Sequence, residues 1–331
     1  MEFNDIGYMR YSDVVHHAMW LGFSIYNPFS IFNYLYLNTN HWAYWNFDSD
    51  FLSSNINVNF DAQFKNMWGL SWDVNRVSQK IEPSMLRGGP KMIMPGSQNF
   101  NITITTDDSK KLGSQMGGSL SRGDANFENS YDYWAGFNYR PINALRLYIN
   151  PGYTYQRNTM QYVAAKSVNN NPVYLFGEIR QKTVAITFRA DLAINPELTI
   201  QYYAQPYISA GKYNNFKQIT DPIADKFADR FHIFSGNEIV YDAGNYNIDS
   251  NGDGVSDFSI PNPDFNFKQV RSNFVVRWEY RPGSTLYLVW SQGRTGSTAT
   301  GNFSYGNDFK DLYKITPHNV FLVKLSYWFA L

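Results

Sequence analysis

Apolar and polar residues alternate along several segments of the chain, most clearly from Asn55 to Lys65. Every second residue there is apolar: Ile56, Val58, Phe60, Ala62 and Phe64. The residues between them are asparagine, aspartate, glutamine or lysine. Successive side chains of a β-strand point to opposite faces, so this segment predicts a strand with one apolar and one polar face. The alternation recurs at 183–192, 273–281 and 321–329.

Turn-forming residues divide these segments, and the connections are of two kinds. Short turns with Pro, Gly, Asn or Asp are expected at 27–28, 66–69, 107–110, 140–144, 195–197 and 281–284. Longer links alternate with them, at about 47–54, 81–98, 122–130, 158–172, 213–266 and 293–317. Short turns on one side and long loops on the other are typical of an outer-membrane barrel, whose long loops are extracellular.

The predicted fold is all-β: a transmembrane antiparallel up-and-down β-barrel of the outer-membrane type, in one domain over residues 1–331. Counting from Val14 gives about thirteen strands, or fourteen if Ile6–Ser12 is also a strand. The barrel is either complete in this chain or part of a larger one. One helix is expected, in Asp221–Phe231. A soluble β-sandwich or propeller, with the aromatic residues as its core, is the alternative.

Composition excludes several other classes of protein. The 331 residues carry 28 basic and 28 acidic side chains, so the basic excess typical of a nucleic-acid partner is missing. No segment approaches the ~18 consecutive apolar residues of a membrane-spanning helix. With no cysteine, disulfides and thiolate metal sites are excluded. The start, Met1–Asp5, does not resemble a signal peptide, so we expect a mature chain or a fragment.

Aromatic residues, 18% of the chain, gather near the ends of the predicted strands. Such positions suit the girdles that flank the apolar band of a membrane barrel. The candidates are Trp42, Tyr44, Trp45, Trp68, Trp72, Tyr280, Tyr327 and Trp328.

Charged residues of both signs are expected to line the lumen of this barrel. They are Asp61, Lys65, Asp132, Arg140, Arg146, Arg189, Asp191, Arg277, Glu279 and Lys324. Two interpretations stay open: the charges line a selective pore, or their mixed signs brace the barrel from within.

An acidic, glycine-rich segment, Asp249–Asp257, is the sharpest candidate for a metal site. Its oxygen donors have the spacing of the first part of a calcium loop: Asp249, Asn251, Asp253, the Val255 carbonyl and Asp257. Ile260 stands where an EF-hand has its glutamate, so the segment resembles the shorter calcium loops of thrombospondin-type and dockerin repeats. We expect either a weak, structural Ca²⁺ site or a solvated turn.

Catalytic chemistry has no comparable signal. His16 and His17 are adjacent and would point to opposite faces of a strand, so they cannot share one metal. The other three histidines have no ligand spacing, and no Ser/His/Asp arrangement stands out. We therefore expect that the chain is not an enzyme.

The predicted loop Glu82–Pro95 is unusually apolar for a long surface loop. It contains Met85, Leu86, Met92, Ile93 and Met94. Either it folds into the mouth of the barrel or contacts a partner, or it packs on its neighbours.

The C-terminal segment Lys324–Leu331 resembles the assembly signal of outer-membrane barrels. Ser326 takes the place usually held by glycine, and Leu331 that of a terminal phenylalanine. The resemblance implies recognition by the barrel-assembly machinery.

Longer segments resemble the DUF5916 family, Bacteroidota barrel proteins of unknown function. They are Phe3–Tyr8, Leu86–Pro90, Asn262–Phe267 and, the longest, Val275–Trp290. The resemblance spans nearly the whole chain. Members of the family carry an upstream carbohydrate-binding-like domain of family 9 type and further strands, which are not in this sequence. The resemblance therefore implies the C-terminal portion of a larger barrel.

These observations favour an envelope protein of the transport or interaction type: a channel, part of a transporter, or a scaffold. The expected location is the bacterial outer membrane. Expected partners are outer-membrane lipid, the assembly machinery, and other envelope proteins or glycans, but no nucleic acid. An outer-membrane hydrolytic enzyme and a glycan-binding surface protein are the alternatives.

Overall fold

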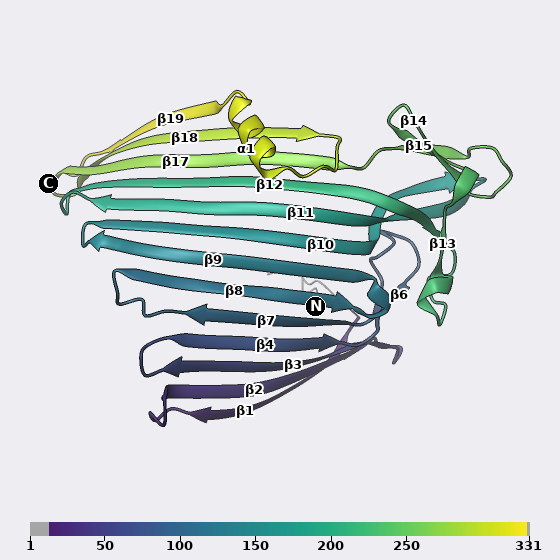
Figure 1. Cartoon of the computed structure of the whole chain (residues 1–331), viewed down its shortest axis with the longest axis horizontal. Helices are drawn as coiled ribbons and strands as arrows, with labels where there is room; N and C mark the ends of the chain where they lie inside the picture. The colour runs from purple at the N-terminus through teal and green to yellow at the C-terminus, as the bar shows by residue number, and fades with distance from the viewer. Residues whose placement is uncertain (1–12, 330–331) are drawn as a thin grey trace.

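Thirteen antiparallel strands form one continuous sheet in the computed structural model, which describes residues 13–329 (Figure 1). In spatial order they are β1 (Val15–Ile25), β2 (Phe32–Trp45), β3 (Phe51–Phe64), β4 (Gly69–Val77), β7 (Ser97–Thr105), β8 (Leu112–Gly123), β9 (Glu128–Ile142), β10 (Leu145–Val168), β11 (Asn171–Ala193), β12 (Leu198–Ile219), β17 (Phe265–Arg281), β18 (Ser284–Thr298) and β19 (His318–Ser326). A fourteenth, β13 (Phe231–Ile233), pairs with the end of β12. The predicted all-β, up-and-down topology and the thirteen strands counted from Val14 are confirmed, whereas Ile6–Ser12 lies outside the described residues.

The two edges of the sheet are β1 and β19, at opposite sides in Figure 1. Within residues 13–329, β1 pairs with β2 and β19 pairs with β18, and neither strand has a second partner. The closure of a barrel is therefore not found in the described part of the chain. No helix in residues 13–329 has both the length and the apolar character needed to cross a membrane.

The alternation in the sequence gives the sheet two unlike faces. On the apolar face, Phe100, Ile102 and Ile104 of β7 keep 39%, 36% and 37% of their surface exposed. The residues between them, such as Asn101 and Thr103, lie on the opposite, polar face. Large apolar side chains exposed along successive strands are uncommon in a water-soluble monomer.

The three long connections, 78–96, 220–264 and 299–317, all lie at one end of the sheet, as predicted (Figure 1). The links predicted at 47–54 and 122–130 lie at the same end but are short, 46–50 and 124–127, because the strands extend into them. The end with the longer connections, here called the loop end, carries two small sheets and β13. One small sheet contains β5 (Lys80–Glu82) and β6 (Met92–Met94); the other contains β14 (Ile239–Asp242), β15 (Asn245–Ile248) and β16 (Phe258–Pro261).

The predicted link 158–172 is wrong, because β10 and β11 continue through it as a hairpin. Asn169 and Asn170 alone form its turn, with φ angles of 50° and 65°. Two successive residues with positive φ are required by a type I′ turn, and asparagine tolerates that conformation. The strands β10, β11 and β12 are 24, 23 and 22 residues long, well beyond the ~9–11 residues that span a bilayer.

The predicted helix in Asp221–Phe231 is also wrong. Only a 3-10 turn, Phe227–Arg230, forms there. Arg230 is buried, and its guanidinium bonds to the carbonyls of Ala224 and Asp225, which a helix would use for its own backbone bonds. An α-helix that the sequence did not predict, α1 (Tyr305–Lys314), instead packs against β17 and β18 and buries Asp308 and Leu312. Two further 3-10 turns span Asp124–Asn126 and Gly236–Glu238.

Candidate functional site

The polar face of β2 and β3 carries a quartet of hydrogen-bonded asparagines. Asn40 Nδ2 donates to Asn57 Oδ1 at 3.1 Å and to Asn38 Oδ1 at 2.9 Å. Asn59 Nδ2 donates to Asn38 Oδ1 at 2.8 Å and also to Asn57. Cross-strand pairing places Asn38 opposite Asn59 and Asn40 opposite Asn57, so the strand register itself assembles the quartet.

The network continues across the next strands. Asn101 Nδ2 donates to Asp73 Oδ2 at 2.9 Å, and Asn99 Nδ2 donates to Ser121 Oγ at 2.7 Å. On β9, the Asp132 carboxylate accepts bonds from Thr154 at 2.6 Å and from Ser119 at 2.9 Å.

These side chains form one unbroken row of cross-strand neighbours, which we call the polar row. From β2 to β12 it contains Asn38, Asn59, Asp73, Asn101, Ser119, Asp132, Thr154, Thr183 and Ser209. The hydroxyls of Thr183 and Ser209 lie 2.8 Å apart. Neutral amides and hydroxyls dominate the polar row, with Asp73 and Asp132 as its two carboxylates. Its groups bond to one another across the strands, which stiffens the wall.

Nine of the ten charged residues predicted for the lumen lie on this polar face. They are Asp61, Asp132, Arg140, Arg146, Arg189, Asp191, Arg277, Glu279 and Lys324. The tenth, Lys65, lies in the turn after β3. Most of them gather at the short-turn end of their strands rather than along the polar row.

Few of these ten charges pair with one another. All lie in the described residues, and one salt bridge joins two of them: Arg277 Nη2 to Glu279 Oε2, at 2.8 Å. Arg146 Nε instead donates to Asn138 at 2.9 Å, and the Arg189 guanidinium lies over the Tyr203 ring at 5.3 Å. Cross-strand bonding on this face therefore comes mainly from amides and hydroxyls.

A second row, on the apolar face at the loop end, was not singled out from the sequence. Direct cross-strand pairing places Arg76, Gln98, Arg122, Asn129, Arg157, Arg180 and Lys212 side by side on β4 to β12. Lys182 lies one position inward, opposite Tyr155. We call the six cations of this set the basic belt: Arg76, Arg122, Arg157, Arg180, Lys182 and Lys212.

The signal for the basic belt was present in the alternation. The even-numbered residues of β11 all lie on one face, so Arg180 and Lys182 lie on the same apolar face as Val184 and Ile186. In β8 and β4, Arg122 and Arg76 likewise follow Leu120 and Val74.

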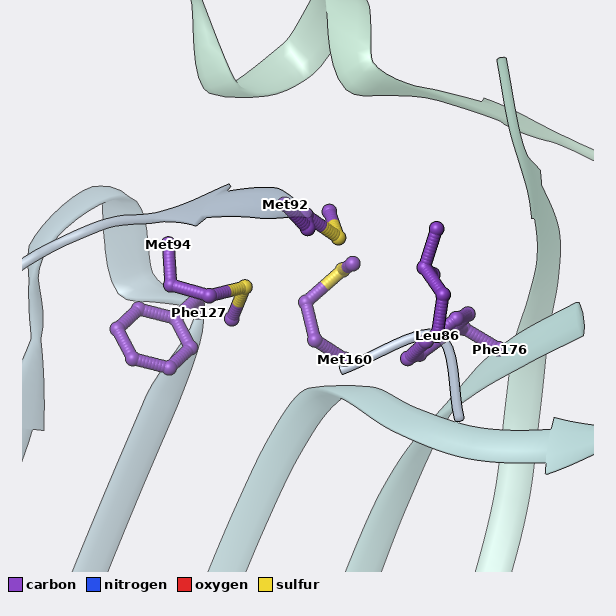
Figure 2. Close-up of a cluster of buried hydrophobic side chains, with 6 residues drawn as sticks. All are labelled: Leu86, Met92, Met94, Phe127, Met160 and Phe176. Carbon is purple, nitrogen blue, oxygen red and sulfur yellow. The ribbon is translucent and has the colours of Figure 1, made fainter. Parts of the chain in front are cut away.

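The apolar loop Glu82–Pro95 packs on its neighbours. Leu86 and Met92 are fully buried and Met94 nearly so, in a cluster with Phe127, Met160 and Phe176 (Figure 2). In Figure 2, the side chains of Met92 from the loop and Met160 of β10 point toward each other, and Leu86 lies next to Phe176.

Arg230 ties this cluster to the longest loop, because it is buried and its guanidinium donates only to carbonyls. Nη1 donates to Ile93 O at 2.9 Å, Nε to Ala224 O at 2.7 Å and Nη2 to Asp225 O at 3.0 Å. The connections between β4 and β7 and between β12 and β17 therefore form one packed unit at the loop end.

The predicted calcium segment forms a tight turn whose carboxylates accept backbone bonds. Asp249 Oδ1 accepts from Gly252 N and Oδ2 from Gly254 N, both at 2.7 Å, and Asp253 Oδ1 accepts from Val255 N at 2.9 Å. The hydroxyl and amide of Ser250 donate to Asp257 at 2.6 and 2.8 Å and lower the pKa of that carboxyl.

Asn251 completes this turn. Its Nδ2 donates to Asp253 Oδ2 at 3.1 Å, and its Oδ1 accepts from Asp253 N at 2.9 Å. Among residues 13–329, no three or more His, Cys, Asp or Glu side chains converge as a metal centre would require. His16 and His17 lie on opposite faces: His16 stacks on Tyr44, and His17 contacts His41.

The fold and this face define the class: an all-β protein built on an up-and-down antiparallel sheet with one polar and one apolar face. A family model described as "Domain of unknown function (DUF5916)" matches residues 1–225 and 230–330. The chain therefore belongs to the DUF5916 family, as the resemblance of its sequence predicted.

Other comparisons add little. No curated protein matches the chain. A solved structure described as "NanC porin structure in rhombohedral crystal form" is similar at 8% identity, covering 84% of this chain and 94% of that one, with a TM-score of 0.27.

Proposed function

We propose that this DUF5916 chain forms the wall of a β-barrel in the bacterial outer membrane and serves transport or interaction there. One observation carries the proposal: the sheet exposes its apolar face and hydrogen-bonds its polar face across successive strands. Hydrocarbon would cover the first face, and water in the lumen would wet the second. The segregation of short turns from longer loops supports the same arrangement.

The proposal requires the sheet to close. In hydrocarbon an unpaired strand edge leaves amide and carbonyl groups without partners, each at a cost of several kcal/mol. The edges β1 and β19 would therefore be paired in the membrane, with each other or with further strands. The polar row would then brace the lumen side of the wall.

The partners in this proposal follow from the surfaces. Outer-membrane lipid would contact the apolar face, the barrel-assembly machinery would recognise the final strand, and envelope proteins or glycans would meet the loop end. The Asp249–Asp257 turn would hold a weak, structural Ca²⁺. The chain itself would act as a channel, part of a transporter or a scaffold, rather than as an enzyme.

Single-cysteine labelling tests the proposal, since the chain has no cysteine of its own. Thr103 and Ile104 are neighbours on β7 and lie on opposite faces. With the protein in liposomes, Thr103→Cys should react with a charged, water-soluble maleimide. Ile104→Cys should resist that reagent and react with a lipid-soluble one. Equal reaction of both cysteines with the charged reagent would reject a membrane wall.

A further inference from the structure

The basic belt places like charges directly opposite one another. Arg157 pairs with Arg180, and Arg180 with Lys212, on three adjacent strands. Like charges in directly opposite positions destabilise a sheet unless an anion lies between them.

The chain supplies some of that negative charge, but not all of it. Glu178 bridges Arg157 and Arg180 at 2.9 Å each, and Asp124 pairs with Arg76 at 2.6 Å. Within residues 13–329, the other three cations of the belt form no salt bridge: Arg122, Lys182 and Lys212, all exposed.

Farther along the same face, on β17 and β18, the protein covers its cations. There α1 lies over the strands (Figure 1), and its Asp308 pairs with the nearly buried Lys268 at 3.1 Å. Arg294 Nη1 donates to Ile315 O at 2.9 Å, just after the helix. Where the chain folds over this face, it therefore provides the cations with partners: a carboxylate for Lys268 and carbonyl oxygens for Arg294. Over β8 to β12, by contrast, Arg122, Lys182 and Lys212 stay exposed.

The belt also lies at the height where lipid headgroups begin. On β10, outward-facing residues from Leu145 to Tyr155 cover ~33 Å at ~3.3 Å per residue, which is ~25 Å of height at a strand tilt of ~40°. That matches the ~25 Å apolar band of an outer-membrane barrel. The next outward residue is Arg157. Tyr155 stacks on Tyr131 just below the belt, with ring centroids 6.0 Å apart, as interfacial aromatics would.

We propose that the basic belt binds the phosphate groups of the lipid in the outer leaflet. Arginine presents a planar fork of donors that matches phosphate oxygens, and lysine adds point charges beside it. The belt lies at the loop end, which is the cell-surface side of an outer-membrane barrel. This inference rests on the proposed function, because it requires the apolar face to be in a membrane.

Lipid A, a phosphorylated glycolipid, is the probe for this proposal. The full chain, folded in detergent micelles, is titrated with lipid A and with the same lipid stripped of its phosphates. The variant Arg122→Gln/Lys182→Gln/Lys212→Gln removes three cations and leaves the salt bridges of Glu178 and Asp124 in place. The matched control, Arg140→Gln/Arg189→Gln/Lys324→Gln, removes three cations from the polar face.

Native chain and control should bind lipid A with the same Kd, and the belt variant at least about tenfold more weakly. The stripped lipid should bind the native chain as weakly as lipid A binds the belt variant. Equal affinity of native chain and belt variant for lipid A, or of both lipids for the native chain, would overturn the proposal. So would displacement of lipid A by millimolar inorganic phosphate, which would indicate a free-anion site.

Heat-modifiable migration on SDS gels, measured on every sample, separates this inference from the proposed function. If the belt variant folds as a barrel and binds lipid A with unchanged affinity, only the inference about the basic belt is rejected. If the chain never folds as a barrel in micelles or liposomes, both the proposed function and the inference are rejected.

Discussion

The long strands and the loop end differ in how far they bury the same types of residue. Ile149 on the apolar face of β10 keeps 42% of its surface exposed, whereas Ile248 of β15, at the loop end, is fully buried. Polar groups show the reverse: the polar row bonds within the sheet, while the loop end carries exposed Asp and Asn in its turns.

The proposed function accounts for this difference by two solvents, water at the loop end and lipid along the strands. A region that folds in water buries its apolar side chains, as the loop end does with Leu86, Met92 and Ile248. A region that folds in lipid gains nothing by burying them and must satisfy its polar groups internally. Under the proposed function both rules would operate in one chain, with the basic belt at the line between the two regions.

Removal of Tyr327–Leu331 should have the largest effect on this arrangement. Tyr327 accepts a bond from Arg281 at 2.7 Å, and Trp328 N donates to Ser284 Oγ at 3.0 Å; Ala330 and Leu331 lie outside the described residues. The truncated chain would lose apolar side chains together with the segment that resembles an assembly signal. Under the proposed function it should therefore not accumulate in the outer membrane. Tyr327→Phe is the control, and normal membrane levels of the truncated chain would contradict the prediction.

A charge on the apolar face should cost less than truncation but still impair folding. Phe60 stacks on Trp72 with ring centroids 5.4 Å apart, and Asp61 is its neighbour on the polar face. If Phe60 lies near the bilayer midplane, Phe60→Arg should destabilise the folded protein by about 2–4 kcal/mol. Asp61→Arg should cost far less, because water would reach it. Urea unfolding in liposomes measures both, and equal defects would exclude the assigned faces.

One chemical change, placed in each region, sharpens the comparison. Ile248→Val should destabilise the loop end by about 0.5–1.5 kcal/mol, because it leaves a small cavity in a packed cluster. Ile149→Val should cost less, because under the proposed function lipid chains would fill the space. Hydrogen exchange of β14–β16 and of β10 reports each effect locally. A larger loss at Ile149 than at Ile248 would mean that the apolar face packs against protein.

Alternation predicted the strands well wherever the period of two is unbroken, as in Thr183–Leu192. It failed where the ladder is irregular: β10 has register shifts between Asn158 and Gln161 and between Tyr162 and Ala164. Each β-bulge moves the following side chains to the other face, so the alternation is lost and the segment looks like a loop.

The candidate sites were predictable to different degrees. The faces of Asp61 and Asp132 followed from local alternation. Alternation also gives the face of the basic-belt residues, but not the belt itself. Arg76, Arg122 and Lys212 fall in one row only through the register of seven strands, which no local pattern specifies. The sequence did not predict the helix α1. Its buried Asp308 pairs with Lys268, a contact between distant segments that no local pattern specifies.

The smallest effect belongs to the Asp249–Asp257 turn. Three carboxylates crowded into nine residues repel one another unless a cation neutralises them. Each of their oxygens already accepts a hydrogen bond within the turn, so a cation would share these oxygens with the turn's own donors. Without a glutamate at the position of Ile260, a Ca²⁺ site there should be weak, with a Kd on the order of 10⁻⁴–10⁻³ M, as in extracellular modules. It should order the turn without altering the sheet.

Calorimetry at millimolar Ca²⁺ should therefore give a binding heat for the native chain, and Asp253→Ala should abolish that heat. Asp242→Ala, in the neighbouring strand β14, is the control. Identical heats for the native chain and Asp253→Ala would leave only a solvated turn, held by its own backbone bonds.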